Sequence, residues 1–267
     1  MLPHVKESCL TLGEIRMDHI EFGHGSKPLI LIQGLNTNGI RGSGLMLSLM
    51  YRKFAKDYRV YLFDRRADLP AEITIRELAH DLALAMDTLK LKEADILGVS
   101  QGGMIAMCLA IERPDLVRKL VLAVTASRNN ETLQRIIEGW VEMTEQNDIK
   151  RLITDMAENM YSDAYLKRYR PILPLLTLVQ KPKDPARFLT LAKSCLTCSV
   201  YGELSRIQCP TLVIGGSRDK IVTAQASREI AERLGCRLHL YDTLGHAAYE
   251  EAGDFNEIVL RFFREHE

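Results

Sequence analysis

The chain has 267 residues, of which 46% are hydrophobic and 26% charged, as in globular proteins that bury a large core. Its 35 Lys and Arg residues balance 35 Asp and Glu residues, so bulk charge favours neither nucleic acid nor an anionic membrane as a partner. No run approaches the roughly 18 apolar residues of a membrane span, and the first residues lack the apolar core of a signal peptide. We expect a cytoplasmic monomer or homodimer with a small-molecule ligand.

The pattern of strands begins with an antiparallel edge. Residues 9–23 look like two short strands joined near Gly13 and Glu14. Continuous apolar runs then indicate strands that are buried on both faces: Pro28 to Gly34, Arg59 to Asp64, Ala94 to Val99, Lys119 to Val124 and Pro210 to Gly216. Helical patterns over residues 44–58, 74–89 and 101–114 lie between the first four runs. This alternation predicts an α/β fold with a mostly parallel sheet and right-handed crossovers.

The alternation stops after Ala126 and returns at Pro210. The block between them, to about Leu204, contains no clear strand and predicts helices over residues 130–146, 148–161, 163–176 and 184–198. We interpret it as an insertion in the sheet domain. A helix over residues 225–235, a strand over 236–242 and a helix over 255–266 then complete the chain.

The six cysteines are scattered, and a chain of this size needs no disulfide to hold it together. They are Cys9, Cys108, Cys195, Cys198, Cys209 and Cys236. Cys195 and Cys198 form a C-x-x-C pair, but neither a second pair nor a thioredoxin-like setting accompanies it. We interpret the pair as two small residues on a helix and expect reduced thiols.

A pattern typical of a catalytic nucleophile lies between a buried strand and a helix, where Gly98 and Gly102 flank Ser100 at a spacing of two. The glycines permit a turn so tight that the serine hydroxyl projects from the edge of the sheet. The N–H of Gln101, at the start of the next helix, then faces a developing oxyanion. Close packing at a strand–helix junction would explain the glycines without catalysis.

A serine nucleophile requires a histidine base and, usually, an acid that orients it. Asp219 follows the strand that ends at Gly216, and His246 follows the next strand. Asp242 is the rival acid, but it stands only four residues before His246. The other histidines lie near the termini, in a loop, or within predicted strands and helices, so we favour Ser100, Asp219 and His246 as a triad in that chain order.

A second oxyanion donor is expected from the loop that follows the strand ending at Gly34, where the N–H of Leu35 is the candidate, next to Gln33. The glycine-rich residues 36–44 lack the ending of a phosphate-binding loop, and we interpret them as a flexible loop over the site.

Together these motifs resemble the α/β-hydrolase superfamily over essentially the whole chain, and in particular its small cytoplasmic esterases, enol-lactonases and non-haem haloperoxidase-like members. The resemblance implies an eight-stranded, mostly parallel sheet with helices on both faces, formed by residues 1–125 and 205–267. It also implies a helical cap at residues 126–204 and neither metal nor organic cofactor. The expected activity is serine-dependent hydrolysis of a small acyl ester, thioester or lactone. Acyl transfer, carbon–carbon bond hydrolysis or elimination, and ligand binding with little turnover stay open, because fold does not choose among them.

The wall of the pocket departs from many relatives. Gln33 replaces a histidine, and the residues after Asp64 lack a glycine-rich segment. Arg65 and Arg66 are either ligands for a substrate carboxylate or solvated or structural side chains. Trp140, Met156 and Met160 of the insertion could line an acyl pocket, although packing within the cap would also explain each of them.

Overall fold

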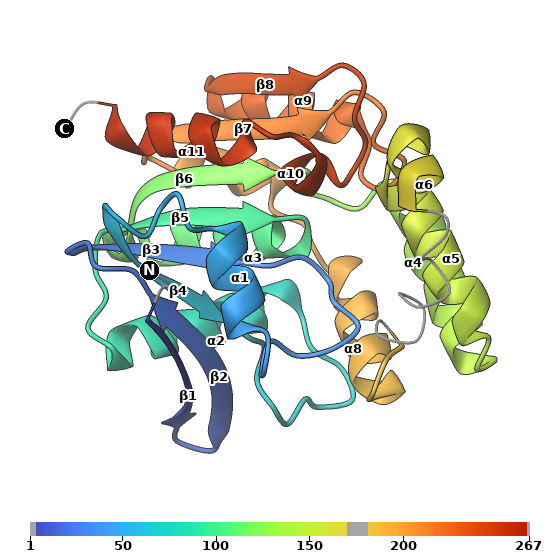
Figure 1. Cartoon of the computed structure of the whole chain (residues 1–267), viewed down its shortest axis with the longest axis horizontal. Helices are drawn as coiled ribbons and strands as arrows, with labels where there is room; N and C mark the ends of the chain where they lie inside the picture. Colours follow the sequence, from blue (N-terminus) through green and yellow to red (C-terminus); the bar gives the residue numbers. More distant parts are fainter. Residues whose placement is uncertain (1–3, 170–180, 266–267) are drawn as a thin grey trace.

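A computed structural model describes residues 4–169 and 181–265 of the chain and contains a sheet of eight strands (Figure 1). The strand order is β1-β2-β4-β3-β5-β6-β7-β8. The bounds are Val5–Leu12 (β1), Ile15–Phe22 (β2), Lys27–Ile32 (β3), Tyr58–Phe63 (β4), Ala94–Val99 (β5), Val117–Ala123 (β6), Thr211–Gly216 (β7) and Arg237–Tyr241 (β8). β2 pairs antiparallel with β1 and β4, and the remaining pairs are parallel. The predicted sheet is confirmed.

The central strands are buried on both faces, as their continuous apolar runs predict. Every residue of β5 and of β7 is buried. In β3, Ile30 and Ile32 belong to the core on one face, and Leu29 and Leu31 to the core on the other. The edge strand β1 has no buried residue. The pattern of apolarity therefore distinguishes the centre of the sheet from its edge.

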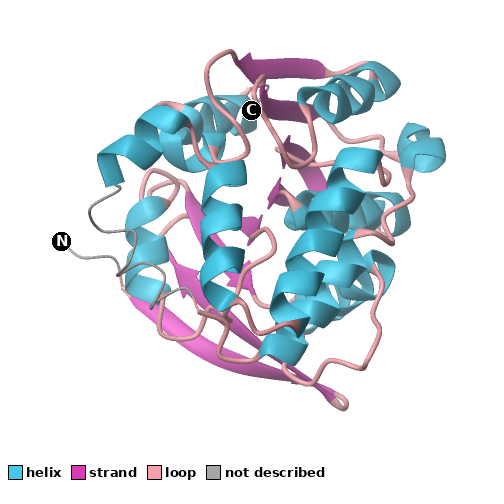
Figure 2. Cartoon of the chain, turned by 90° about the vertical axis from the view of Figure 1, so that its right-hand side faces the viewer, coloured by secondary structure: helices cyan, strands magenta, loops and turns pink. Residues whose placement is uncertain are grey.

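Helices cover both faces of the sheet (Figure 2). One core includes residues of α2 (Ile75–Thr88), α3 (Gln101–Glu112) and α9 (Ala224–Leu234), and the other includes residues of α1 (Gly44–Met50) and α11 (Phe255–Arg264). α3 is buried along nearly its whole length. Its sequence has no polar face because the sheet, α2 and the insertion surround it.

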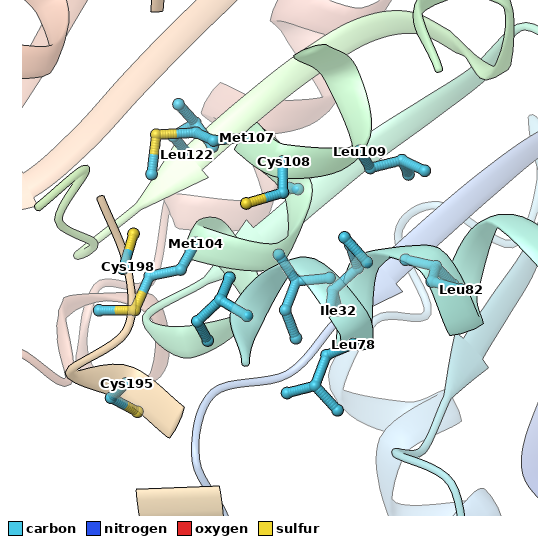
Figure 3. Packing of buried hydrophobic residues seen from close by; sticks show 14 of the residues in the cluster. Ile32, Leu78, Leu82, Met104, Met107, Cys108, Leu109, Leu122, Cys195 and Cys198 are labelled. Carbon is cyan, nitrogen blue, oxygen red and sulfur yellow. The ribbon is translucent and has the colours of Figure 1, made fainter. Parts of the chain in front are cut away.

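The insertion between β6 and β7 contains α4 (Glu131–Glu145), α5 (Ile149–Met160), α6 (Asp163–Tyr169), α8 (Pro185–Cys195) and a short 3₁₀ helix at Tyr201–Arg206. Its core is continuous with the layer around α3, and Figure 3 shows Met104 of α3 and Cys198 of the insertion in that layer. The ends of the insertion lie side by side: the N–H of Val200 donates to the carbonyl of Ser127 at 2.8 Å, and Arg128 forms a single antiparallel bridge with Ser199.

Three local features differ from the predicted elements or extend them. α1 ends at Met50, turns follow over residues 51–57, and Tyr58 already belongs to β4, where its hydroxyl donates to Asp95 at 2.8 Å. α10 (Ala248–Glu251) was not predicted, since four residues carry no periodicity. The helix predicted over 163–176 is α6 as far as Tyr169, and its remainder lies outside the described residues. Within the described ranges, every helix is too short or too polar to cross a membrane.

Candidate active site

Ser100 occupies a strained turn between β5 and α3, with φ 53° and ψ −120°. A residue with a Cβ atom adopts such a positive φ only where its surroundings impose it. Here the N–H of Ser100 donates to Ala123 at 2.9 Å, and its carbonyl accepts from the Thr125 hydroxyl at 2.7 Å. Gly102 permits the close packing, because a Cβ there would lie 2.0 Å from the carbonyl oxygen of Ile32. The turn presents the serine side chain at the carboxyl end of β5.

The structure brings Ser100, His246 and Asp219 together in one series of hydrogen bonds. Nε2 of His246 lies 2.9 Å from Oγ of Ser100, and Nδ1 lies 2.9 Å from Oδ2 of Asp219. Asp219 and His246 are buried, on loops that follow β7 and β8. A carboxylate only accepts hydrogen bonds, so Nδ1 donates to it and Nε2 is left to accept from the serine hydroxyl. The rival acid, Asp242, is exposed and makes no such bond.

Asp219 is held as a carboxylate. Burial alone would raise its pKa, but His246 and the backbone N–H groups of Ile221 and Val222 outweigh burial and lower the pKa below its ordinary value. Those two N–H groups donate to Oδ1 at 2.8 and 3.0 Å. Oδ2 is therefore available to orient the imidazole of His246.

The two predicted oxyanion donors belong to backbone segments near Ser100. Gln101 is the first residue of α3, so its N–H has no acceptor inside the helix. Leu35 and Gly34 line the same pocket as Ser100 and His246. Two segments of backbone, the loop after β3 and the first turn of α3, therefore adjoin Ser100.

The pocket beside Ser100 is mostly apolar and narrow, with a cavity volume of about 30 Å³. The insertion contributes Trp140, Met156 and Met160, all named from the sequence as candidate substrate contacts. The indole of Trp140 is fixed, since its Nε1 donates to Asp155 at 2.8 Å. The other lining residues are Gly34, Leu35, Met104, Leu133, Ile137, Cys195, Ile221, His246 and Tyr249.

A second pocket adjoins the first and shares Gly34, Leu35, Met156, Met160 and Tyr249 with it. Gln33, another candidate substrate contact, lines this second pocket, together with α1 residues such as Met46 and Met50.

Glu250 is the one charged side chain among the described residues that line the second pocket, and it accepts from the Tyr161 hydroxyl at 2.7 Å. Sequence reasoning missed Glu250 and Tyr161 because they belong to no motif. Their only signal is indirect: Glu250 follows His246 by four residues, and Tyr161 ends a helix of the insertion.

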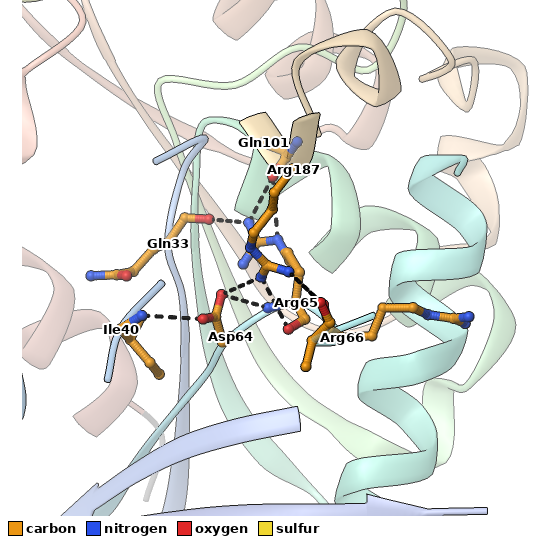
Figure 4. Close-up of polar contacts among 8 residues, drawn as sticks. Gln33, Ile40, Asp64, Arg65, Arg66, Gln101 and Arg187 are labelled. Atoms are coloured by element: carbon orange, nitrogen blue, oxygen red, sulfur yellow. Dashed lines mark hydrogen bonds and ion pairs between the residues drawn. The ribbon is translucent and has the colours of Figure 1, made fainter. Parts of the chain in front are cut away.

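Arg65 and Arg66, the other candidates for substrate contact, line neither of these pockets. Arg66 forms an ion pair with the buried Asp81, with Nε 2.6 Å from Oδ2. Arg65 is itself buried and donates to Gln33 and Gln101 (Figure 4). The structure thus supports the structural alternative for both arginines.

No group of three His, Cys, Asp or Glu side chains arranged to hold a metal occurs in residues 4–169 and 181–265. Cys195 and Cys198 are both buried free thiols. Cys195 lies at the end of α8, and its Sγ is 3.3 Å from Nε2 of Gln101, whereas Cys198 lies beyond the helix.

Known proteins resemble this chain both in sequence and in fold. A family model described as alpha/beta hydrolase fold matches residues 27–253. The chain is 27% identical over 238 residues to the "Putative carbamate hydrolase RutD" of Rhizobium rhizogenes, covering 85% of this chain and 91% of that protein. It is 21% identical over 239 residues to 3-oxoadipate enol-lactonase 2 of Acinetobacter baylyi, covering 86% of each. The solved enol-lactonase of Burkholderia xenovorans LB400 has a TM-score of 0.85 at 22% identity, covering 97% of this chain and 100% of that one.

Proposed function

This chain belongs to the alpha/beta hydrolase fold family, and on that premise we propose that it is a serine hydrolase of small esters, thioesters or lactones. The observation that carries the proposal is the series of hydrogen bonds from Ser100 through His246 to Asp219, each 2.9 Å long. A partly exposed serine with a buried imidazole and a buried carboxylate behind it provides the groups that acyl-enzyme chemistry requires.

In the proposed reaction, Oγ of Ser100 attacks the substrate carbonyl while Nε2 of His246 accepts the serine proton. Asp219 stabilises the imidazolium that forms. The backbone N–H groups of Leu35 and Gln101 donate to the oxyanion. His246 then returns the proton to the leaving group, and the acyl group stays on Ser100 until water, activated by the same imidazole, releases it.

The apolar lining beside Ser100 supports an uncharged acyl group as the preferred substrate portion, with Trp140, Met156 and Met160 as its contacts. Gln33, in the adjoining pocket, would contact the portion of the substrate that leaves. A carbamate offers an electrophilic carbonyl of similar shape. The similarity to the RutD protein makes carbamates the second candidate class.

The nucleophile is tested by treating the wild type and Ser100→Ala with a fluorophosphonate probe and locating the labelled residue by mass spectrometry. We expect one label, on Ser100, and none on the variant. A panel of acyl esters, thioesters, lactones and carbamates of graded length, run on both proteins, then ranks the substrate classes. Absence of label on folded wild type, or panel activity that survives in Ser100→Ala, would refute the proposal.

A further inference from the structure

Arg65 connects the two segments that carry the proposed oxyanion donors. Its Nη2 donates to the carbonyl of Gln33 at 2.6 Å and to Oε1 of Gln101 at 2.9 Å, and its Nε donates to the same Oε1 at 3.2 Å (Figure 4). Gln33 lies two residues before Leu35, and Gln101 follows Ser100. One planar guanidinium thus bridges the loop after β3 and the first residue of α3.

The neighbouring residue, Asp64, holds the other end of the same loop. Its Oδ2 accepts from the N–H of Ile40 at 3.1 Å, and its Oδ1 accepts from the N–H of Arg65 at 2.7 Å. Consecutive residues at the end of β4 therefore fix both Gln33 and Ile40. The loop that was expected to be flexible is attached to the core on either side of Leu35.

The network extends into the insertion through α8. Nε2 of Gln101 donates to the carbonyl of Leu191 at 2.8 Å and to Oγ of Ser194 at 3.1 Å. Arg187 of α8 donates to the carbonyl of Arg66 at 2.6 Å and pairs with Asp64 at 3.2 Å. The side chain of Gln101 is thus held from both of its ends, by Arg65 and by α8.

Burying a guanidinium costs free energy unless hydrogen bonds and opposite charges compensate for its lost hydration. Only 6% of Arg65 is exposed, and burial lowers its pKa to about 10, so that it stays protonated at neutral pH. A lysine could not reach both acceptors with a planar fork. Since Arg65 lines neither pocket beside Ser100, a direct role in binding substrate does not explain it.

We infer that Arg65 is a positioning residue for the oxyanion hole: it fixes the distance between the backbone that carries Leu35 and the N–H of Gln101. The inference rests on the proposed serine-hydrolase function. Because the oxyanion forms only during reaction, loss of this positioning should lower kcat and leave ground-state binding nearly unchanged.

The test compares Arg65→Met and Arg65→Lys with the wild type on one good ester substrate. Rates are divided by the concentration of active sites, counted from the endpoint of fluorophosphonate labelling, so that unfolded protein does not contribute. We expect kcat to fall about 10²-fold, within the range for loss of an oxyanion donor, with KM changed by less than about 3-fold. The affinity for a boronic acid transition-state analogue should fall by the same factor as kcat/KM.

Arg66→Met is the matched control, because it removes the adjacent arginine and the ion pair with Asp81 but nothing that contacts Gln33 or Gln101. We expect it to lower stability and leave kcat per active site unchanged. A double-mutant cycle adds Gln101→Met, which keeps the backbone N–H. If Arg65 acts through the Gln101 side chain, the effects of the two changes on kcat should be clearly less than additive.

The outcomes separate this inference from the proposed function. Wild-type protein that is neither labelled at Ser100 nor active would refute the hydrolase proposal. An active wild type whose Arg65 variants lose only stability, with kcat and analogue affinity per active site intact, would overturn the role of Arg65 alone. Equal loss of kcat in Arg66→Met would also overturn it.

Discussion

A Cβ atom on Gly34 would lie 3.2 Å from the Cβ of Ser100, which is tighter than an ordinary van der Waals contact, so the loop that carries Leu35 passes close to Ser100. Gly34→Ala should push this loop away by a few tenths of an ångström. Because small misplacements of catalytic groups are costly, we expect kcat to fall about 10- to 100-fold, with little change in the melting temperature. Steady-state kinetics and thermal unfolding measure the two effects.

Gly139→Ala is the control for that substitution, since its new Cβ meets no atom within 4 Å in α4. It should leave kcat unchanged and stabilise the helix by roughly 0.5–1 kcal/mol. Equal activity in the two alanine variants would show that the loop is not near the reacting atoms.

Asp219→Asn should lower kcat for every substrate by a similar factor, about 10³- to 10⁴-fold. An amide can donate to Nδ1 of His246, which would place the imidazole proton on Nε2 and block acceptance of the serine proton. The exposed Asp242 provides the comparison, and Asp242→Asn should retain wild-type rates. A larger loss in Asp242→Asn would mean that the acid is wrongly assigned.

Met156→Ala should shift the preference toward longer acyl chains, since the side chain lines both pockets near Ser100. One methylene in an apolar pocket is worth about 10-fold or more in kcat/KM. Met143→Ala is the matched change on α4, outside both pockets. We would measure kcat/KM over an ester series, and a uniform loss without reordering would contradict a role for Met156 in selectivity.

Glu250 should select against anionic leaving groups. Three esters with one acyl group and alcohols of similar shape, one cationic, one neutral and one anionic, test this through kcat/KM. Glu250 is exposed, so we expect steps of only about 3- to 10-fold between the esters. Glu250→Gln should remove the steps without slowing the neutral ester.

Glu158→Gln is the matched control, because it removes an exposed charge from α5 outside both pockets. This variant should retain the differences in kcat/KM between the cationic, neutral and anionic esters. Charge steps that persist in Glu250→Gln would assign the selectivity to another group.

His19 should make the fold less stable in mild acid. It is buried in β2, stacks on Phe63 at 5.7 Å, and its Nδ1 has no partner among the described residues. Burial lowers its pKa below the ordinary 6.5. The unfolded chain therefore binds more protons, and the free energy of unfolding should fall as pH drops below about 6.5, by at most about 1.4 kcal/mol per pH unit. Urea titrations between pH 5 and 7.5 should give a smaller slope for His19→Leu, and an equal slope would contradict the assignment.

The sheet was predictable because its central strands are buried on both faces and each therefore reads as one short apolar run. The triad candidates were predictable for a related reason: Ser100 and Asp219 each follow such a run, His246 follows the last predicted strand, and the carboxyl ends of parallel strands meet at one edge of the sheet. Each signal is local in the sequence.

The roles of Arg65 and Glu250 could not be predicted in this way. Arg65 donates a hydrogen bond to Gln101, which is 36 positions away, and Gln101 in turn donates one to the carbonyl of Leu191, 90 positions further on. Glu250 lies on a helix of four residues, and its partner Tyr161 comes from the insertion. Such contacts depend on how the insertion packs on the sheet domain, which no local pattern specifies.

The bridge between Arg128 and Ser199 has a consequence for how this chain could diversify. A segment whose ends meet can be lengthened, shortened or replaced at little entropic cost to the rest of the fold, about 0.6 kcal/mol for each doubling of its length. The contacts of α8 limit which parts of the insertion can be replaced, since Arg187 of α8 forms an ion pair with Asp64 at the end of β4. Chimaeras that exchange α4 to α6 between relatives should therefore fold with an intact reaction centre, whereas those that exchange α8 would need the matching end of β4 from the same parent.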